Sequence, residues 1–108
     1  MPVPLYRAKA EFFRTLGHPA RIRVLELLAE HDRPVHELLD SIDIAASNLS
    51  QQLGVLRLAG LVTQRREGGE VIYSLALPEV EHLLTAARAI ITARATDVMV
   101  DDMSRDAR

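Results

Sequence analysis

Amide and hydroxyl side chains crowd one face of the segment from residue 45 to residue 59, where a water-facing helix would usually carry Glu and Lys. Leu49, Leu53 and Leu56 recur at three- and four-residue spacing, which predicts a helix with its leucines toward a core. The opposite face stays uncharged until Arg57. Amide side chains can make paired hydrogen bonds to base edges in the major groove of DNA, and Ser can reach phosphate. The candidate DNA-binding side chains of this face are Ser47, Asn48, Ser50, Gln51 and Gln52.

Charge is spread unevenly along the chain. The net charge of −2 argues at first against a nucleic-acid partner, because affinity for phosphate comes from concentrated Lys and Arg. Residues 44–66, however, contain no acidic side chain and include Arg57, Arg65 and Arg66, whereas residues 24–43 contain six acidic side chains and only one arginine. The first of these two stretches is therefore suited to an anionic partner.

Two β-prone runs, residues 62–66 and 71–75, flank a pair of glycines, Gly68 and Gly69. Gly-Gly between such runs predicts a tight hairpin, because the favoured hairpin turns need positive φ at both central positions. Arg65, Arg66 and Gly68 are the candidate DNA contacts of this hairpin. Side chains alternate along a strand, so we expect one of the two arginines to face away from DNA and only to keep the strand hydrated.

The remaining elements follow from apolar spacing and from Pro and Gly. We expect helices over residues 5–16, 19–30, 34–39 and 78–98, a tight turn at residues 40–43 with Asp43 as the cap of the next helix, and Gly60 as the left-handed end of the amide-rich helix. His18 is expected to cap or pack. A short helix, a turn, an amide-rich helix and a hairpin in this order predict a winged helix-turn-helix: mainly α with a β-hairpin wing (α+β), about five helices and two strands.

The first and last predicted helices carry apolar stripes that one small domain cannot cover. Such stripes predict a homodimer, because a closed twofold interface is the commonest way to bury them. The expected interface residues are Phe12, Phe13, Leu83, Leu84, Ala87, Ile90 and Ile91. With 108 residues, the chain is expected to form one domain over residues 1–100, followed by a charged, disordered tail over residues 101–108.

Several classes of protein are disfavoured. The chain has no Cys, and its first residues lack the basic and apolar regions of a signal peptide, so we expect a cytoplasmic protein with no membrane partner. A Cys nucleophile, a Gly-rich phosphate loop and a His-Glu-x-x-His helix are all missing from the sequence. We therefore do not expect an enzyme.

Three blocks of sequence resemble the ArsR/SmtB family of bacterial regulators. They are HPARIRVLELL at residues 18–28, SNLSQQLGVLRLAGLV at residues 47–62 and REGGEVIYSL at residues 66–75, in family order and at family spacing. The resemblance spans about residues 12–84. It implies a winged-helix dimer, formed through the first and last helices, that binds double-stranded operator DNA and represses transcription until an effector loosens it.

The resemblance is incomplete where the family's metal sensors bind metal. The positions of their Cys-x-Cys pair are occupied here by Pro34, Val35 and His36. On the last helix His82 follows Glu79 and Glu81, but the second family histidine is missing near Ala93. One His with carboxylates is a weak site for a divalent ion. We therefore expect no required cofactor, with weak nickel or zinc binding at His82 as the open alternative.

Two further departures concern DNA. Gln52 stands where the family has a His in the recognition helix, and Glu70 follows the hairpin glycines where a basic residue is common. The first is expected to alter base preference and the second to weaken a phosphate contact. An alternative of another kind is a regulator that acts chiefly through a protein co-regulator, bound by the acidic residues 26–43 or by the tail. The operator, the effector and the sign of regulation are not predicted.

Overall fold

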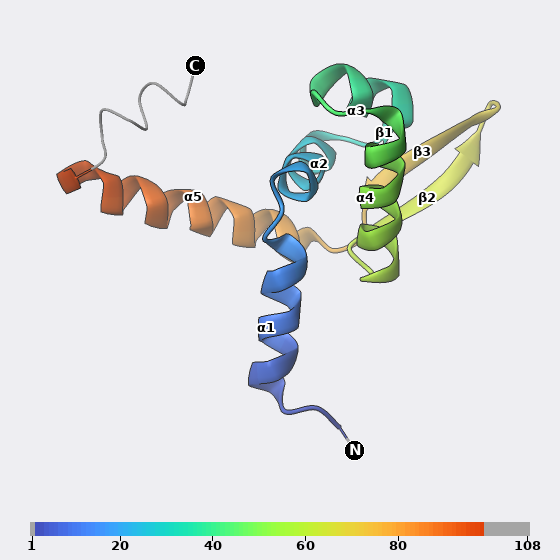
Figure 1. Ribbon diagram of the computed structural model, residues 1–108. Coiled ribbons are helices and arrows are strands. Elements are labelled where there is room, and N and C mark those ends of the chain that lie inside the picture. Colours follow the sequence, from blue (N-terminus) through green and yellow to red (C-terminus); the bar gives the residue numbers. More distant parts are fainter. Residues whose placement is uncertain (1, 99–108) are drawn as a thin grey trace.

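The protein is described by a computed structural model of residues 2–98, with side chains through residue 95. This part of the chain forms five helices and three strands, shown in Figure 1. In chain order they are α1 (Leu5–Leu16), α2 (Pro19–Glu30), β1 (Arg33–Pro34), α3 (Val35–Ser41), α4 (Ala46–Leu58), β2 (Val62–Glu67), β3 (Glu70–Leu75) and α5 (Pro78–Val98). The order confirms the predicted winged helix-turn-helix. The tail predicted at residues 101–108 lies outside the described residues.

The hairpin belongs to a sheet with one strand more than the two predicted. β2 and β3 pair antiparallel with the register Val62↔Leu75 to Glu67↔Glu70, and Gly68 and Gly69 have φ angles of 57° and 84°, as the hairpin turn requires. β1 then pairs with the free side of β3, giving the order β1-β3-β2. A two-residue strand that contains a proline has neither the length nor the alternation that would reveal it in sequence.

Leucines from the helices fill the core. Leu25 of α2, Leu38 of α3, and Leu49 and Leu56 of α4 are fully buried, and Leu53 is 2% exposed. The leucine face predicted for residues 45–59 is therefore the face that α4 turns toward the core. Since these leucines occupy one side of α4, its other side is left for contacts outside the subunit.

Local signals set most helix ends. His18 caps α2, its Nδ1 accepting from the Ala20 N–H at 3.2 Å. At the end of α4 the N–H of Gly60, which has φ 78°, donates to the Arg57 carbonyl, and the N–H of Leu61 donates to the Leu56 carbonyl, which is a Schellman motif. The predicted Asp43 cap is wrong. α4 starts after Ala45 with no side-chain cap, because α3 extends through Ser41 and the connection is shifted to residues 42–45.

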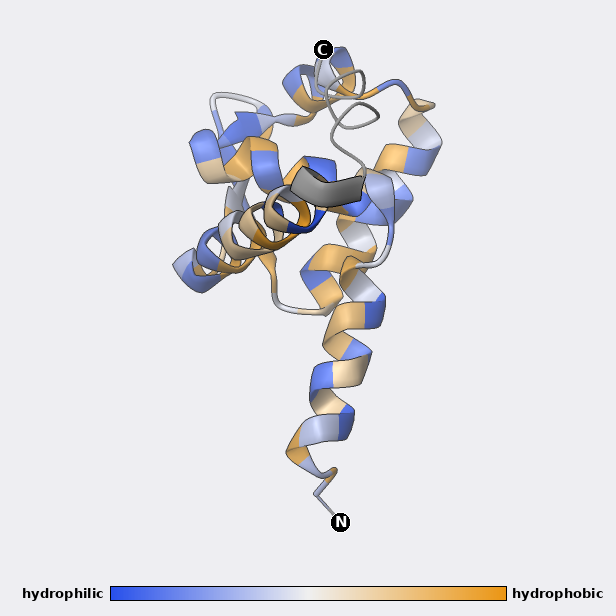
Figure 2. Ribbon diagram, turned by 90° about the vertical axis from the view of Figure 1, so that its left-hand side faces the viewer, coloured by the Kyte–Doolittle hydropathy of each residue, from blue (hydrophilic) through white to orange (hydrophobic). Residues whose placement is uncertain are grey.

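Helices α1 and α5 project from the body formed by α2, α3, α4 and the sheet (Figure 1). Both carry exposed apolar side chains. The hydrophobic residues of α1 are coloured orange along its ribbon in Figure 2. Phe13 is 54%, Ile90 64% and Ile91 42% exposed. The other predicted interface residues, Phe12, Leu83, Leu84 and Ala87, are half-buried. None of the described helices is long and apolar enough to cross a membrane.

Candidate nucleic-acid interface

The outer face of α4 is polar and free of acidic groups. Ser47, Ser50, Gln51 and Arg57 are exposed on it, and Asn48 is half-buried. The helix has no acidic residue in its first turn and one basic residue, Arg57, in its last. These positions agree with the polar face expected from sequence. Chemically, the face offers amide and hydroxyl groups to base edges and phosphates.

Gln52 does not belong to that exposed face, although it was expected to read bases. Its side chain is 6% exposed. Its Oε1 accepts from Arg21 Nε at 2.7 Å, and its Nε2 donates to Asn48 Oδ1 at 2.9 Å. Both ends of the amide are therefore occupied inside the subunit. The structure corrects the expectation: Gln52 lies between α2 and the outer face of α4 and does not itself face outward.

The amino end of α4 is open to an anion. No side chain caps its first turn, and the nearest acidic residue in sequence, Asp43, makes no hydrogen bond to it. The first N–H groups of a helix lack partners inside the helix and carry the positive end of its dipole. The 13-residue α4 therefore presents backbone donors beside the exposed hydroxyl-bearing residues Ser47 and Ser50.

Arg65 on the wing is engaged by its own subunit. Its Nε donates to Glu67 Oε2 at 2.7 Å, and its Nη1 donates to Asp32 Oδ2 and to Ser74 Oγ, each at 2.8 Å. The bonds to Glu67 and then Asp32 raise the pKa of Arg65 above its ordinary value, and those from Arg65 and then Ser74 lower the pKa of Asp32 below its ordinary value. Arg65 is thus the arginine of the pair that is held away from an external anion.

Arg66 is exposed and has no ion-pair or hydrogen-bond partner among the described residues. It pairs in register with Val71, two positions before the exposed turn glycine Gly68. At the same end of the hairpin, Glu70 Oε1 lies 3.0 Å from Nε2 of His36 on α3. The carboxylate of Glu70 is therefore turned toward α3, and Arg66 is the unpaired cation of the wing.

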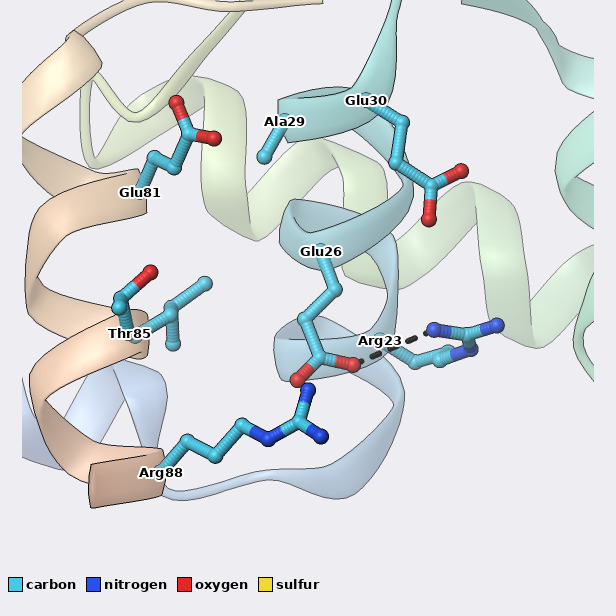
Figure 3. Close-up of a pocket in the computed structure, with 8 residues that line it drawn as sticks. Arg23, Glu26, Ala29, Glu30, Glu81, Thr85 and Arg88 are labelled. Carbon is cyan, nitrogen blue, oxygen red and sulfur yellow. Dashed lines mark hydrogen bonds and ion pairs between the residues drawn. The ribbon is translucent and has the colours of Figure 1, made fainter. Parts of the chain in front are cut away.

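Weak nickel or zinc binding at His82 stays a prediction. His82 is exposed on α5, and no group of three or more His, Asp or Glu side chains in that part of the chain could hold a metal ion. Between α2 and α5 lies a cavity of about 370 Å³, shown in Figure 3, where Arg23 pairs with Glu26 at 3.3 Å. The residues lining it are Arg23, Glu26, Ala29, Glu30, Glu81, Leu84, Thr85 and Arg88.

The sequence pattern did not reveal two residues that shape this surface. Arg21 lies 31 positions before Gln52, and Asp32 lies 33 positions before Arg65. No local pattern reveals contacts at such separations. A partial signal existed in the spacing of Asn48 and Gln52, because side chains four apart on a helix are neighbours and an amide pair at that spacing can form a hydrogen bond.

The polar face of α4, the hairpin beside it and the leucine core between helices define a winged helix-turn-helix DNA-binding protein. Residues 18–64 match the sequence profile described as "Bacterial regulatory protein, arsR family". The chain belongs to this ArsR/SmtB family of transcriptional regulators, and it is a regulator rather than an enzyme.

Two relatives illustrate the similarity. The chain is 58% identical over 95 residues to the uncharacterized HTH-type transcriptional regulator Rv0081 of Mycobacterium tuberculosis, covering 87% of this chain and 83% of that protein. It is 40% identical over 97 residues to the biofilm growth-associated repressor of Agrobacterium fabrum, covering 86% and 83%.

Solved structures share the fold. The crystal structure of Rv0081 superposes with a TM-score of 0.81 at 56% identity, covering 89% of this chain and 97% of that one. The solution structure of Mb0332 from Mycobacterium bovis, described as a homodimeric winged helix-turn-helix DNA-binding domain, gives a TM-score of 0.76 at 25% identity, covering 88% of each chain.

Proposed function

We infer that the protein is a transcriptional repressor that binds a palindromic operator as a homodimer. The single observation that carries this proposal is the acid-free outer face of α4, with Ser47, Ser50 and Gln51 exposed and the unpaired Arg66 on the adjacent wing. In this arrangement α4 enters the major groove, where Gln51 and Asn48 read base edges. Arg66, Ser50 and the amino end of α4 contact phosphates.

The dimer is proposed to form through α1 and α5. The support is the exposure of Phe13, Ile90 and Ile91 on two helices that project from the body. Burying apolar surface contributes roughly 25 cal/mol per Å², so such side chains favour association. A twofold dimer requires half-sites about one helical turn apart, about 34 Å. Mb0332, described as homodimeric, and the repressor of Agrobacterium fabrum support the assembly and the sign of regulation.

The metal-free protein is proposed to be the form that binds DNA. The support is chemical: no cysteine is present in the sequence, and His82 stands without a second nitrogen ligand nearby in the described part of α5. Tight zinc sites need several nitrogen or sulfur ligands. Neither a metal nor a protein co-regulator is therefore required for operator binding in this proposal.

A footprint of the chelator-treated protein on its own upstream region tests the proposal. We expect protection of a palindrome with two half-sites, competed by the same fragment but far less by a scrambled one. The difference between specific and non-specific affinity is typically 10³-fold or more for such proteins. Equal binding to operator and scrambled DNA over a salt series would sink the proposal.

A further inference from the structure

A line of hydrogen bonds runs from the end of α1 to the outer face of α4. Arg21 Nη1 donates to the Thr15 carbonyl at 3.1 Å, Arg21 Nε donates to Gln52 Oε1 at 2.7 Å, and Gln52 Nε2 donates to Asn48 Oδ1 at 2.9 Å. Arg21 is half-buried, and Gln52 is 6% exposed. We call these bonds the Arg21 relay.

The relay has only one chemically consistent direction. A guanidinium has five N–H donors and no acceptor, so the atom of Gln52 that faces Arg21 has to be the carbonyl oxygen. The Gln52 amide nitrogen must then face Asn48, and a nitrogen donor needs an oxygen opposite it. The orientation of both amides therefore follows from the identity of Arg21.

The outer end of the relay is the amide nitrogen of Asn48. This nitrogen has no partner among the described residues, and Asn48 lies in the first turn and a half of α4, where recognition helices contact bases. Its Oδ1 already accepts from Gln52. An Asn side chain that is free to rotate can bind adenine with both its carbonyl oxygen and its amide nitrogen. An Asn side chain held by Gln52 in this way presents N–H donors outward.

We propose that Arg21 and Gln52 are specificity-determining residues that fix Asn48 as a hydrogen-bond donor toward the operator. Asn48 then selects a base edge that presents acceptors, namely guanine O6 and N7 or thymine O4. It disfavours cytosine, and it does not bind adenine through its oxygen and its nitrogen together. Arg21 and Gln52 are positioning residues that act through Asn48. The inference rests on the proposed function, since it requires α4 to lie in the major groove.

The variant Gln52→Glu reverses the outer end of the relay. Its carboxylate still accepts from Arg21 but cannot donate to Asn48, so the Asn48 amide turns its nitrogen inward and its oxygen toward DNA. Selection from randomised DNA with the full-length protein, read by sequencing, measures the result. Asn48→Ala identifies the operator position that Asn48 reads, as the position where preference disappears.

At that position we expect Gln52→Glu to shift the preference from guanine or thymine to cytosine or adenine. The ratio should change at least about fivefold, which corresponds to the lower value of about 1 kcal/mol for a base-edge contact. Gln64→Glu is the control, because it makes the same substitution at an exposed position of β2 outside the relay; it should leave this position unchanged. A purely structural role of Gln52 would change affinity or melting temperature and not the selected base.

The outcomes separate the two proposals. If wild-type protein selects a sequence but folded Gln52→Glu selects the same base at the Asn48 position, the relay proposal is overturned while the proposed function stands. If wild-type protein selects no sequence, the proposed function fails, and the relay proposal with it. If Gln52→Glu does not fold by circular dichroism, Gln52→Met replaces it. That variant frees the Asn48 amide, so the preference should weaken at least about fivefold, and undiminished preference would overturn the relay.

Discussion

Arg65 donates from Nη1 to Oδ2 of Asp32 at 2.8 Å, which ties the wing to the segment before β1 across 33 positions of sequence. The neighbouring Arg66 has no such partner in the described part of the chain. Two adjacent arginines of the same strand therefore differ in what they can offer to DNA. One stabilises the wing, and the other is available for phosphate.

Replacing Arg66 by Ala should weaken binding to operator and scrambled DNA alike. Each phosphate contact contributes about 0.9 to the slope of log K against log salt, so the slope of the dimer should fall by about two. Arg65→Ala is the matched control and should reduce the slope by less than one, because that side chain already has partners. Fluorescence anisotropy over a salt series measures both slopes. Equal reductions would contradict the division between the two arginines.

Replacing Gln51 by Ala should cost about 1 to 3 kcal/mol on the operator and almost nothing on scrambled DNA. The reason is that Gln51 is exposed on α4 and a base-edge contact carries sequence information, whereas phosphate contacts do not. Titrations of both DNAs at one salt concentration measure the difference. Equal losses on the two sequences would refute a base-reading role for Gln51.

Replacing Ile90 by Asp should dissociate the dimer at micromolar concentration, because a carboxylate in an apolar interface loses its hydration without gaining a partner. Leu58→Asp is the control: it adds the same charge at a residue that is 90% exposed at the end of α4, outside the set of proposed interface residues. Analytical ultracentrifugation should give a dimer for wild type and Leu58→Asp, and a monomer for Ile90→Asp. A wild-type monomer, or an unaffected Ile90→Asp dimer, would disprove the proposed interface.

One equivalent of nickel or zinc per subunit should change operator affinity by less than about tenfold, or 1.4 kcal/mol. A metal can shift binding only by its differential affinity for two dimer geometries, and the exposed His82 provides a weak ligand set. His82→Ala should leave the DNA affinity of chelator-treated protein nearly unchanged. A much larger metal-induced loss that disappears in His82→Ala would identify a metal sensor.

The Asp32 contact should add a small acid sensitivity to folding. Arg65 and Ser74 lower the pKa of Asp32 below its ordinary 3.8. Its contribution to stability is therefore complete above pH about 4 and is lost as pH falls through the lowered pKa. Because the side chain is 46% exposed, the contribution should stay below about 1 kcal/mol. Urea unfolding between pH 2 and 6 should show a flatter pH dependence for Asp32→Asn than for the control Asp40→Asn; identical profiles would contradict the role of this contact.

Structural features that depend on one helix or one turn were predicted well from the sequence. The leucine spacing of α4, the glycines of the hairpin, the His18 cap and the left-handed Gly60 all depend on neighbours within a few residues. Their physical causes, periodicity and positive φ, are properties of residue types and are visible without the fold.

Contacts between distant segments were not predictable in this way. Gln52 is of a residue type that can read bases, but it is buried beside Arg21, which α2 brings next to it. β1 depends on β3 for its hydrogen bonds, since two residues cannot form a strand alone. The Asp43 cap prediction was wrong because it depended on element bounds that are set beyond the local sequence: α3 runs to Ser41 and α4 begins only after Ala45.

The strand order β1-β3-β2 has a consequence for the protein when it is not bound to DNA. A sheet edge displays unpaired N–H and C=O groups that can recruit strands from other molecules and start aggregation. At one edge, β1 is two residues long and contains Pro34, which has no N–H to offer. At the other, β2 carries the charged side chains of Arg65, Arg66 and Glu67. Both borders of the sheet therefore have features that disfavour the addition of a further strand.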